Sequence, residues 1–123
     1  MKKYIKDIKI LFIEDDLIAS QGLIRILSMI GIENVDYANN CSIGLDKFKH
    51  CEYDLIISDI ETPIMNGIEL ATNIRNENKD IPIIFTTGYS CDYYKNSAKN
   101  LNVSYFSKPF KVERLIERIG FLV

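Results

Sequence analysis

Short apolar runs alternate with amphipathic segments along the whole chain, and this alternation is the feature that most restricts its fold. Five runs have the length of a β-strand and are rich in aliphatic, β-branched or aromatic residues: 8–13, 35–38, 55–58, 83–87 and 103–106. Three of them show little alternation with polar residues, which is typical of strands buried on both faces of a parallel sheet. The pattern therefore predicts five strands, most of them internal to a sheet.

The segments between these runs carry apolar residues at helical spacing. They are 17–30, with Ile18, Leu23, Ile26, Leu27 and Ile30 on one side, a short one around Leu45 and Phe48, one after Asn66, a more polar one at 92–100, and a last one beginning near Val112. Five strands alternating strictly with five helices predict a doubly wound α/β fold with a five-stranded parallel sheet. At 123 residues the chain suits one core, so we expect a single domain over 1–123.

Charge and cysteine content exclude several classes of protein. Fifteen basic and seventeen acidic residues leave a formal charge of −2, and only Lys2, Lys3 and Lys6 form a basic group, so direct binding of nucleic acid is not expected. Three cysteines without metal-like spacing predict reduced, mostly structural thiols. The polar N-terminus and the lack of a membrane-length apolar run predict a cytoplasmic protein that does not bind membranes.

Charged and hydroxyl residues follow the predicted strands. They are Glu14, Asp15 and Asp16 after the first, Asp59 after the third, Thr86 and Thr87 at the end of the fourth, and Lys108 and Pro109 after the fifth. In open parallel sheets the ligand site lies beyond the carboxyl ends of the strands. Buried carboxylates need partners, and their hard oxygen atoms suit Mg²⁺, with Mn²⁺ as an alternative. Asp16 alone is interpreted more simply as a helix cap.

Four segments at these positions, IKILFIEDD, YDLIISDIETPIMNGIEL, IPIIFTTGY and SYFSKPF, resemble the response-regulator receiver family of the chemotaxis-regulator type. The resemblance covers essentially the whole chain and implies a flavodoxin-like (βα)5 fold. It also implies a cytoplasmic two-component phosphorelay switch. In this role Asp59 takes a phosphoryl group from a sensor histidine kinase or a histidine phosphotransfer protein in a Mg²⁺-dependent reaction. By this resemblance the domain is not an enzyme, apart from its own phosphorylation and dephosphorylation.

The resemblance also assigns roles to single residues. Asp59 is the phosphoacceptor, Asp15 the more direct metal ligand and Glu14 its acidic neighbour, while Asp59 and the backbone carbonyl of Glu61 complete the metal ligands. Thr87 and Lys108 contact the phosphoryl group, Thr87 and Tyr105 form the switch pair, and the Lys108–Pro109 bond is expected to be cis. Residue physics alone does not separate Thr86 from Thr87. The absence of a dedicated general base fits phosphoryl transfer, and the one histidine, His50, is expected at the surface.

Two residues depart from the common pattern of the family. Glu61 and Tyr89 lie two residues after Asp59 and Thr87, where the family tunes loss of the phosphoryl group. Tyr89 is expected to shield the acyl phosphate from water, whereas Glu61 either orients or repels that water. The helix at 92–100, the fifth strand and the last helix are expected to form the face that partners read. The output is then a downstream protein or a fused domain, and the apolar ending 121–123 slightly favours a continuation.

Three other functions are compatible with parts of the sequence. Asp59, Ile60, Glu61 and Thr62 superficially match the DxDxT motif of haloacid-dehalogenase-type phosphatases, but the motif lies mid-chain and Glu61 replaces the usual aspartate. A receiver-shaped binding module that never takes phosphate would be expected to lack at least one of four residues: the acceptor, the metal-binding acid, the hydroxyl residue or the lysine. All four are present here. A nucleotide-binding flavodoxin-like domain would need a glycine-rich loop after the first strand, where this chain is acidic.

Overall fold

The structure, a computed structural model, describes residues 4–123, so Lys2 and Lys3 of the basic group lie outside the described residues. Five parallel strands form one sheet in the order β2-β1-β3-β4-β5. Their bounds are β1 Lys9–Ile13, β2 Asn34–Ala38, β3 Leu55–Asp59, β4 Ile83–Thr87 and β5 Ser104–Ser107. Each predicted strand is present within one residue of its expected ends, and the doubly wound α/β fold is confirmed.

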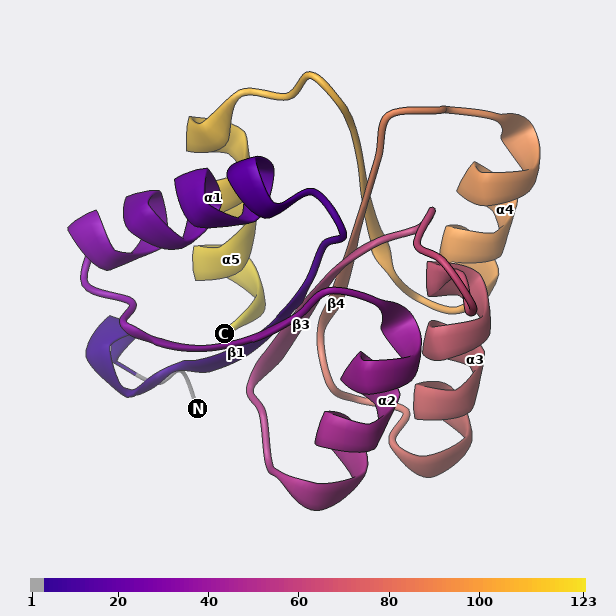
Figure 1. Ribbon diagram of the computed structural model, residues 1–123, viewed down its shortest axis with the longest axis horizontal. Helices are drawn as coiled ribbons and strands as arrows, with labels where there is room; N and C mark the ends of the chain where they lie inside the picture. Colours follow the sequence, from indigo (N-terminus) through magenta and orange to yellow (C-terminus); the bar gives the residue numbers. More distant parts are fainter. Residues whose placement is uncertain (1–3) are drawn as a thin grey trace.

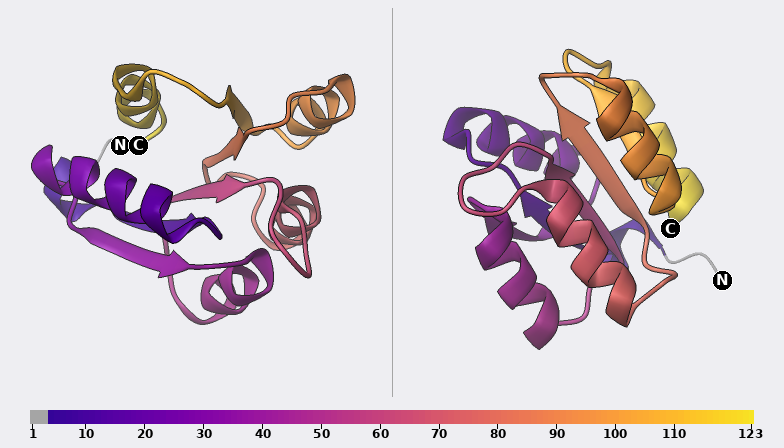
Figure 2. Two further views of the ribbon diagram at one scale, coloured as in Figure 1. Left: turned by 45° about the horizontal axis from the view of Figure 1, so that its top comes forward. Right: turned by 90° about the vertical axis from the view of Figure 1, so that its right-hand side faces the viewer.

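The described residues also form five α-helices and one short 3₁₀-helix. Their bounds are η1 Ile5–Asp7, α1 Leu17–Met29, α2 Cys41–His50, α3 Gly67–Glu77, α4 Asp92–Asn100 and α5 Val112–Leu122. Helices α1 to α4 connect successive strands, η1 precedes β1, and α5 follows β5. Helices α1 and α5 cover one face of the sheet, and α2, α3 and α4 cover the other (Figures 1 and 2). Within residues 4–123, no helix combines the length and the apolar character that crossing a membrane requires.

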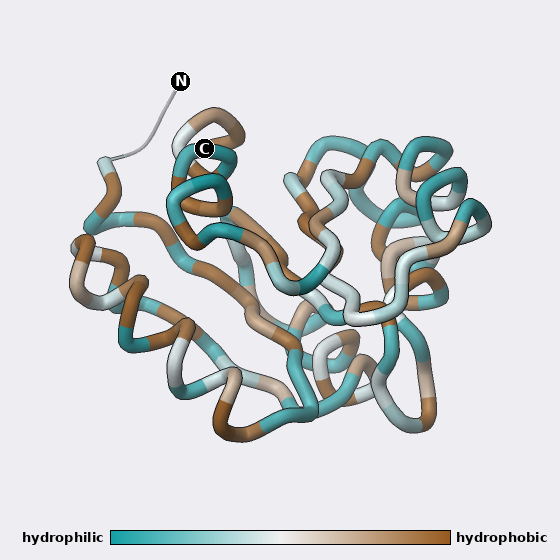
Figure 3. The backbone as a smooth tube through the Cα atoms, turned by 90° about the horizontal axis from the view of Figure 1, so that it is seen from above, coloured by the Kyte–Doolittle hydropathy of each residue, from teal (hydrophilic) through white to brown (hydrophobic). Residues whose placement is uncertain are grey.

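The central strands divide the core into two apolar layers. In β1, Leu11 and Ile13 pack toward α2 and α3, whereas Ile10 and Phe12 pack toward α1 and α5. Both sets are almost fully buried, so β1 has little polar alternation, as expected for an internal strand. Figure 3 shows these apolar strands between helices of mixed hydropathy.

The first helix corrects one detail of the sequence interpretation. Ile18 was expected on the buried side, but it is 82% exposed. The face that packs on the sheet contains Leu23, Ile24 and Leu27, which follow the i, i+3, i+4 spacing of a helix. Ile18 lies on another side of the first turn, so the prediction for this residue was wrong.

Local signals in the sequence set the helix ends. Asp16 caps α1 by accepting hydrogen bonds from the amides of Ile18 and Ala19, at 3.0 and 3.1 Å, which confirms its capping role. After α1, Gly31 adopts a φ of 97°. The Gly31 amide donates to Ser28 and the next amide donates to Leu27, so the helix ends in a Schellman motif.

The three cysteines are all free thiols. Cys41 is buried in the core between α2 and the sheet, as expected of a structural thiol. Cys51 is exposed at the end of α2 and Cys91 is half-buried, so Cys51 is the exception to the expectation of mostly structural thiols. His50, the last residue of α2, is exposed, and its Nδ1 lies 3.6 Å from a carboxylate oxygen of Asp46.

Candidate functional site

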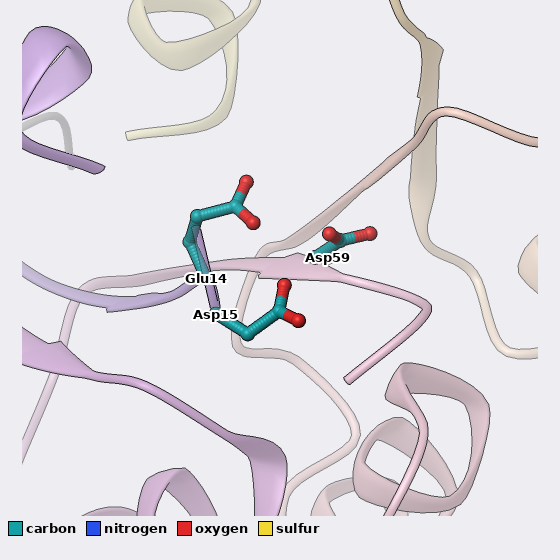
Figure 4. A group of neighbouring side chains, drawn as sticks. All are labelled: Glu14, Asp15 and Asp59. Atoms are coloured by element: carbon teal, nitrogen blue, oxygen red, sulfur yellow. The ribbon is translucent and has the colours of Figure 1, made fainter. Parts of the chain in front are cut away.

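Three carboxylates meet at the carboxyl ends of β1 and β3. Each of Glu14, Asp15 and Asp59 offers an oxygen atom within 4.8 Å of the others. Figure 4 shows Glu14 and Asp15 leaving the end of β1 beside Asp59, which ends β3. Parallel pairing places these two strand ends together, because Ile13 is opposite Ser58 in the register. The acids predicted from separate parts of the sequence therefore form one cluster.

The ammonium group of Lys108 lies against this cluster. Its Nζ donates to Glu14 Oε1 at 2.8 Å and lies 3.5 Å from Asp59 Oδ2. Lys108 follows β5, and its backbone amide donates to the carbonyl of Thr87 at the end of β4. The bond between Lys108 and Pro109 is cis, as expected from the sequence. Side chains 94 residues apart in the chain thus come into contact.

Burial makes the negative charges of Glu14 and Asp59 unfavourable unless nearby positive charge compensates them. Glu14 is 3% exposed and Asp59 is 6% exposed. Burial raises the pKa of Asp59 to about 6, and the charge of Glu14 adds to the increase, while Lys108 opposes it. Burial alone lowers the pKa of Lys108, but the hydrogen bond to Glu14 and the charge of Asp59 outweigh this and raise it. Lys108 therefore stays charged, and one lysine does not neutralise three acids.

The donor set fits a hard divalent cation. Carboxylate oxygens are the ligands that Mg²⁺ prefers, and this ion usually takes one or two protein carboxylates together with water and phosphate oxygens. Asp15 is exposed. Partial desolvation is the largest cause that raises the pKa of its carboxyl group, and the hydrogen bond with Glu14 is the second, so binding of a proton or a cation to this group is favoured. Lys108 already engages Glu14, which leaves Asp15 and Asp59 as the more available ligands. The larger role of Asp15 as a metal ligand stays a prediction.

Thr87 ends β4 and is fully buried, but its hydroxyl is engaged away from Asp59. It lies 3.0 Å from Glu61 Oε1 and 2.9 Å from the carbonyl of Tyr89, and it accepts from the Tyr89 amide. A hydroxyl has one proton to donate, so these two acceptors compete for it. The carboxylate of Glu61 is thus a direct partner of the predicted switch hydroxyl, a contact that the sequence did not suggest.

The two tyrosines that the sequence assigns to this region lie near the surface. Tyr105, on the edge strand β5, is half-buried, and its hydroxyl donates to Ser90 Oγ at 3.0 Å. Tyr89 is 61% exposed, and its ring meets that of Tyr94 on α4 edge to face at 6.1 Å. The ring of Tyr89 is therefore held against α4, and its expected shielding of a phosphoryl group stays a prediction.

Residues 10–120 match the family described as response regulator receiver domain. The chain belongs to this family. The receiver domain is 37% identical over 114 residues to "Response regulator ArlR" of Staphylococcus epidermidis (strain ATCC 12228 / FDA PCI 1200), covering 89% of this chain and 50% of that protein. It is 31% identical over 116 residues to "Probable transcriptional regulatory protein SilR" of Salmonella typhimurium, covering 94% of this chain and 50% of that one. The chain thus spans about half the length of these curated relatives.

Solved structures with the same fold agree with this assignment. The receiver domain resembles the chemotaxis protein CheY4 of Vibrio cholerae with a TM-score of 0.84 and 27% identity, covering 94% of this chain and 98% of that chain. It resembles a two-component response regulator from Clostridium difficile with a TM-score of 0.86 and 30% identity, covering 94% and 95%. It is therefore the receiver domain of a two-component response regulator with a CheY-like, flavodoxin-like fold. These matches give no support to the phosphatase and nucleotide-binding alternatives.

The structure of the receiver domain adds residues that the sequence analysis missed. The hydroxyl of Thr62 donates to Met65 O at 2.7 Å and accepts from the Cys41 amide at 3.1 Å, which fastens the loop after Asp59 to α2. Gly67 begins α3 so close to this loop that a Cβ there would lie 2.8 Å from Asp59 O. Three turn-forming residues in the sequence, Pro63, Asn66 and Gly67, were a signal for this close approach.

Tyr37 is a second missed residue. Its hydroxyl donates to the backbone carbonyl of Glu14, and its ring packs against Phe12 at a centroid distance of 6.3 Å. The only signal in the sequence was an aromatic residue with a polar end near the carboxyl end of a strand. Such a signal is too common to single out Tyr37.

Proposed function

We propose that this receiver domain is a phosphoacceptor switch that takes a phosphoryl group on Asp59 from a sensor histidine kinase or a histidine phosphotransfer protein, in the presence of Mg²⁺. One observation carries the proposal. Lys108 Nζ lies 2.8 Å from Glu14 and 3.5 Å from Asp59, beside three carboxylates whose oxygens lie within 4.8 Å. Phosphoryl transfer depends mainly on positioning and on positive charge near the transferred group. The ammonium group beside Asp59 and a cation held by the acidic cluster would supply that charge.

In the proposed reaction a carboxylate oxygen of Asp59 attacks the phosphorus atom. A new O–P bond forms, the bond from phosphorus to the donor nitrogen or oxygen breaks, and its electron pair leaves with the donor. Bound Mg²⁺ would supply positive charge to the phosphoryl oxygens. Lys108, held by Glu14, would stabilise the same oxygens and keep Asp59 ionised. The domain itself needs no general base and turns over no other substrate, so we propose no enzymatic activity beyond its own phosphorylation and dephosphorylation.

The acyl phosphate would then compete for the hydroxyl of Thr87. A phosphoryl group brings additional negative charge and strong acceptor oxygens. Thr87 would release Glu61 and donate to this group, which would free space for Tyr105 to leave Ser90 and turn inward. The neighbouring face of α4, β5 and α5 would report the change. A groove of about 690 Å³ lies on the β5 and α5 part of this face, lined by Phe106, Arg114 and other side chains of these two elements and the loop between them. The output would be a downstream protein or a further domain.

Intact mass spectrometry tests the acceptor. The parent protein is incubated with acetyl phosphate and Mg²⁺ and should gain the mass of one phosphoryl group, whereas Asp59→Asn should gain none. The control variant Glu52→Gln changes an exposed acid after α2 and should gain the same mass as the parent. EDTA should abolish the phosphoryl adduct in both the parent and Glu52→Gln. An adduct on Asp59→Asn, or an unmodified parent in the presence of Mg²⁺, would contradict the proposal and favour a binding module that takes no phosphate.

A further inference from the structure

Strand β2 holds the backbone of Glu14 at two points. The Glu14 amide donates to the carbonyl of Ala38 at 3.1 Å, as an extension of the ladder between β1 and β2. On the other side of the residue, the hydroxyl of Tyr37 donates to the Glu14 carbonyl. A side chain therefore continues the restraint by β2 beyond the last backbone pair, Ile13 with Ala38.

The carbonyl that Tyr37 holds belongs to the peptide that joins Glu14 to Asp15. A peptide group is planar, so fixing the carbonyl oxygen also fixes the amide and Cα of Asp15. Asp15 is exposed and lies between β1 and α1, outside any helix or strand. Its carboxylate nevertheless reaches the group formed with Glu14 and Asp59. The orientation of this peptide therefore sets the position of the Cα atom from which the Asp15 carboxylate extends.

Tyr37 is itself well anchored. It is half-buried, it packs on the core layer beneath α1 and α5, and it lies opposite Phe12 in the parallel register. The contact between the two rings fixes the direction of the tyrosine, so its hydroxyl reaches the Glu14 carbonyl from a rigid strand. Ligand sites keep their geometry when the groups behind the ligands are held in this way.

We propose that Tyr37 is a positioning residue for the divalent cation: its hydroxyl orients the Glu14–Asp15 peptide so that the Asp15 carboxylate faces Asp59. This inference rests on the Mg²⁺ site of the proposed function. Tyr37 touches neither the cation nor the phosphoryl group, and it acts only through the backbone of Glu14. A purely structural role of Tyr37 would affect stability and leave the affinity for the cation unchanged.

The test is a Mg²⁺ titration of isotope-labelled protein, followed by amide chemical shifts without any phosphoryl donor. Tyr37→Phe keeps the ring and its packing on Phe12 but removes the hydroxyl. Its dissociation constant for Mg²⁺ should increase by about tenfold, as for other groups that orient metal ligands. Tyr53→Phe is the matched control, because the Tyr53 hydroxyl donates to Asp36 at 2.7 Å and is also part-buried, away from the acidic cluster. Its dissociation constant should equal that of the parent.

The outcomes distinguish failure of the positioning role from failure of the phosphoacceptor proposal. Saturable binding to the parent, with weaker binding to Tyr37→Phe alone, supports the positioning role. Equal binding to the parent and to Tyr37→Phe overturns this role and leaves the phosphoacceptor proposal intact. If Tyr53→Phe weakens Mg²⁺ binding to the same extent, the positioning role is also overturned, because loss of a tyrosine hydroxyl away from the acidic cluster would then have the same effect. A parent that binds no Mg²⁺ overturns both proposals.

Discussion

Replacing Asp59 with asparagine should stabilise the fold in the absence of divalent cations. Asp59 is almost completely buried, beside the equally buried Glu14. Removing its charge relieves the cost of burial and the repulsion by Glu14. Lys108 keeps a partner, because its hydrogen bond to Glu14 at 2.8 Å does not involve Asp59. A change at the proposed reactive residue should therefore raise stability at neutral pH.

The shifted pKa of Asp59 gives the magnitude and its dependence on pH. The pKa is about 6 in the folded protein against an ordinary value of 3.8, a gap of about 2 units. At 1.36 kcal/mol per unit this amounts to at most about 3 kcal/mol. Because the pKa of Asp59 is raised in the folded state, the free energy of unfolding of the parent is highest below about pH 4. It decreases by this amount as the pH rises through about 6. Asparagine removes this loss, so the variant should be about 2 to 3 kcal/mol more stable than the parent at pH 7.5.

Urea unfolding followed by far-UV circular dichroism, in EDTA, measures this difference. The stability gap between Asp59→Asn and the parent should shrink toward zero as the pH falls through and below about 4, because the carboxyl group then becomes protonated in the unfolded chain as well as in the folded one. Glu52→Gln, a change at an exposed acid, should stay within about 0.5 kcal/mol of the parent at both pH values. Mg²⁺ should narrow the gap at pH 7.5 by stabilising the parent. A gap that is independent of pH, or a less stable variant at pH 7.5, would refute the electrostatic argument.

Three further changes test other contacts. Gly67→Ala places a Cβ 2.8 Å from Asp59 O and should lower the free energy of unfolding in urea by about 1 to 3 kcal/mol. Gly120→Ala, with open space around the new Cβ, should lower it by nothing. Equal effects of the two changes would contradict the packing argument. Arg75→Met removes donors to four backbone carbonyls around the ends of α3 and α4 and should cost about 2 to 4 kcal/mol, and a loss below about 1 kcal/mol would show that water replaces them. Glu61→Gln removes the negative charge that engages Thr87 and repels a phosphoryl donor. Acetyl phosphate should therefore modify this variant roughly fivefold faster than the parent in a time course followed by mass spectrometry, which corresponds to a barrier lower by about 1 kcal/mol. An unchanged or slower rate would contradict this.

The internal strands were predictable because burial on both faces leaves a strong signal in the sequence. In β3 every residue is buried, and four consecutive positions of its run carry aliphatic residues or serine. The surface helices carry a weaker signal. An isoleucine such as Ile18 looks the same in the sequence on either side of a helix, and only the fit of α1 to the sheet decides which apolar residues face inward. This is why the expected buried side of α1 was wrong at one residue.

The acidic cluster was predictable for a topological reason, whereas its hydrogen bonds were not. Parallel strands put their carboxyl ends at one edge of the sheet, so acids that end β1 and β3 meet whatever their rotamers are. The contacts of Thr87 with Glu61 and of Tyr37 with the Glu14 carbonyl depend on side-chain direction over a few ångströms. Residue types and spacing do not contain this information, because several acceptors are within reach of each hydroxyl.

The same charges link the stability of the domain to the reactivity that we propose for it. With Glu14, Asp15 and Asp59 ionised and Lys108 protonated, the cluster carries a net charge of −2, an excess of negative charge. Within it, burial and then the charge of Glu14 raise the pKa of Asp59 to about 6. A divalent cation would cancel the excess, and by doing so it would both stabilise the fold and lower the pKa of the nucleophile. A phosphoryl donor approaching the site without the cation would meet a negative cluster instead. The instability of the cation-free site and the cation dependence that we propose for its reaction would therefore be two consequences of one arrangement of buried acids.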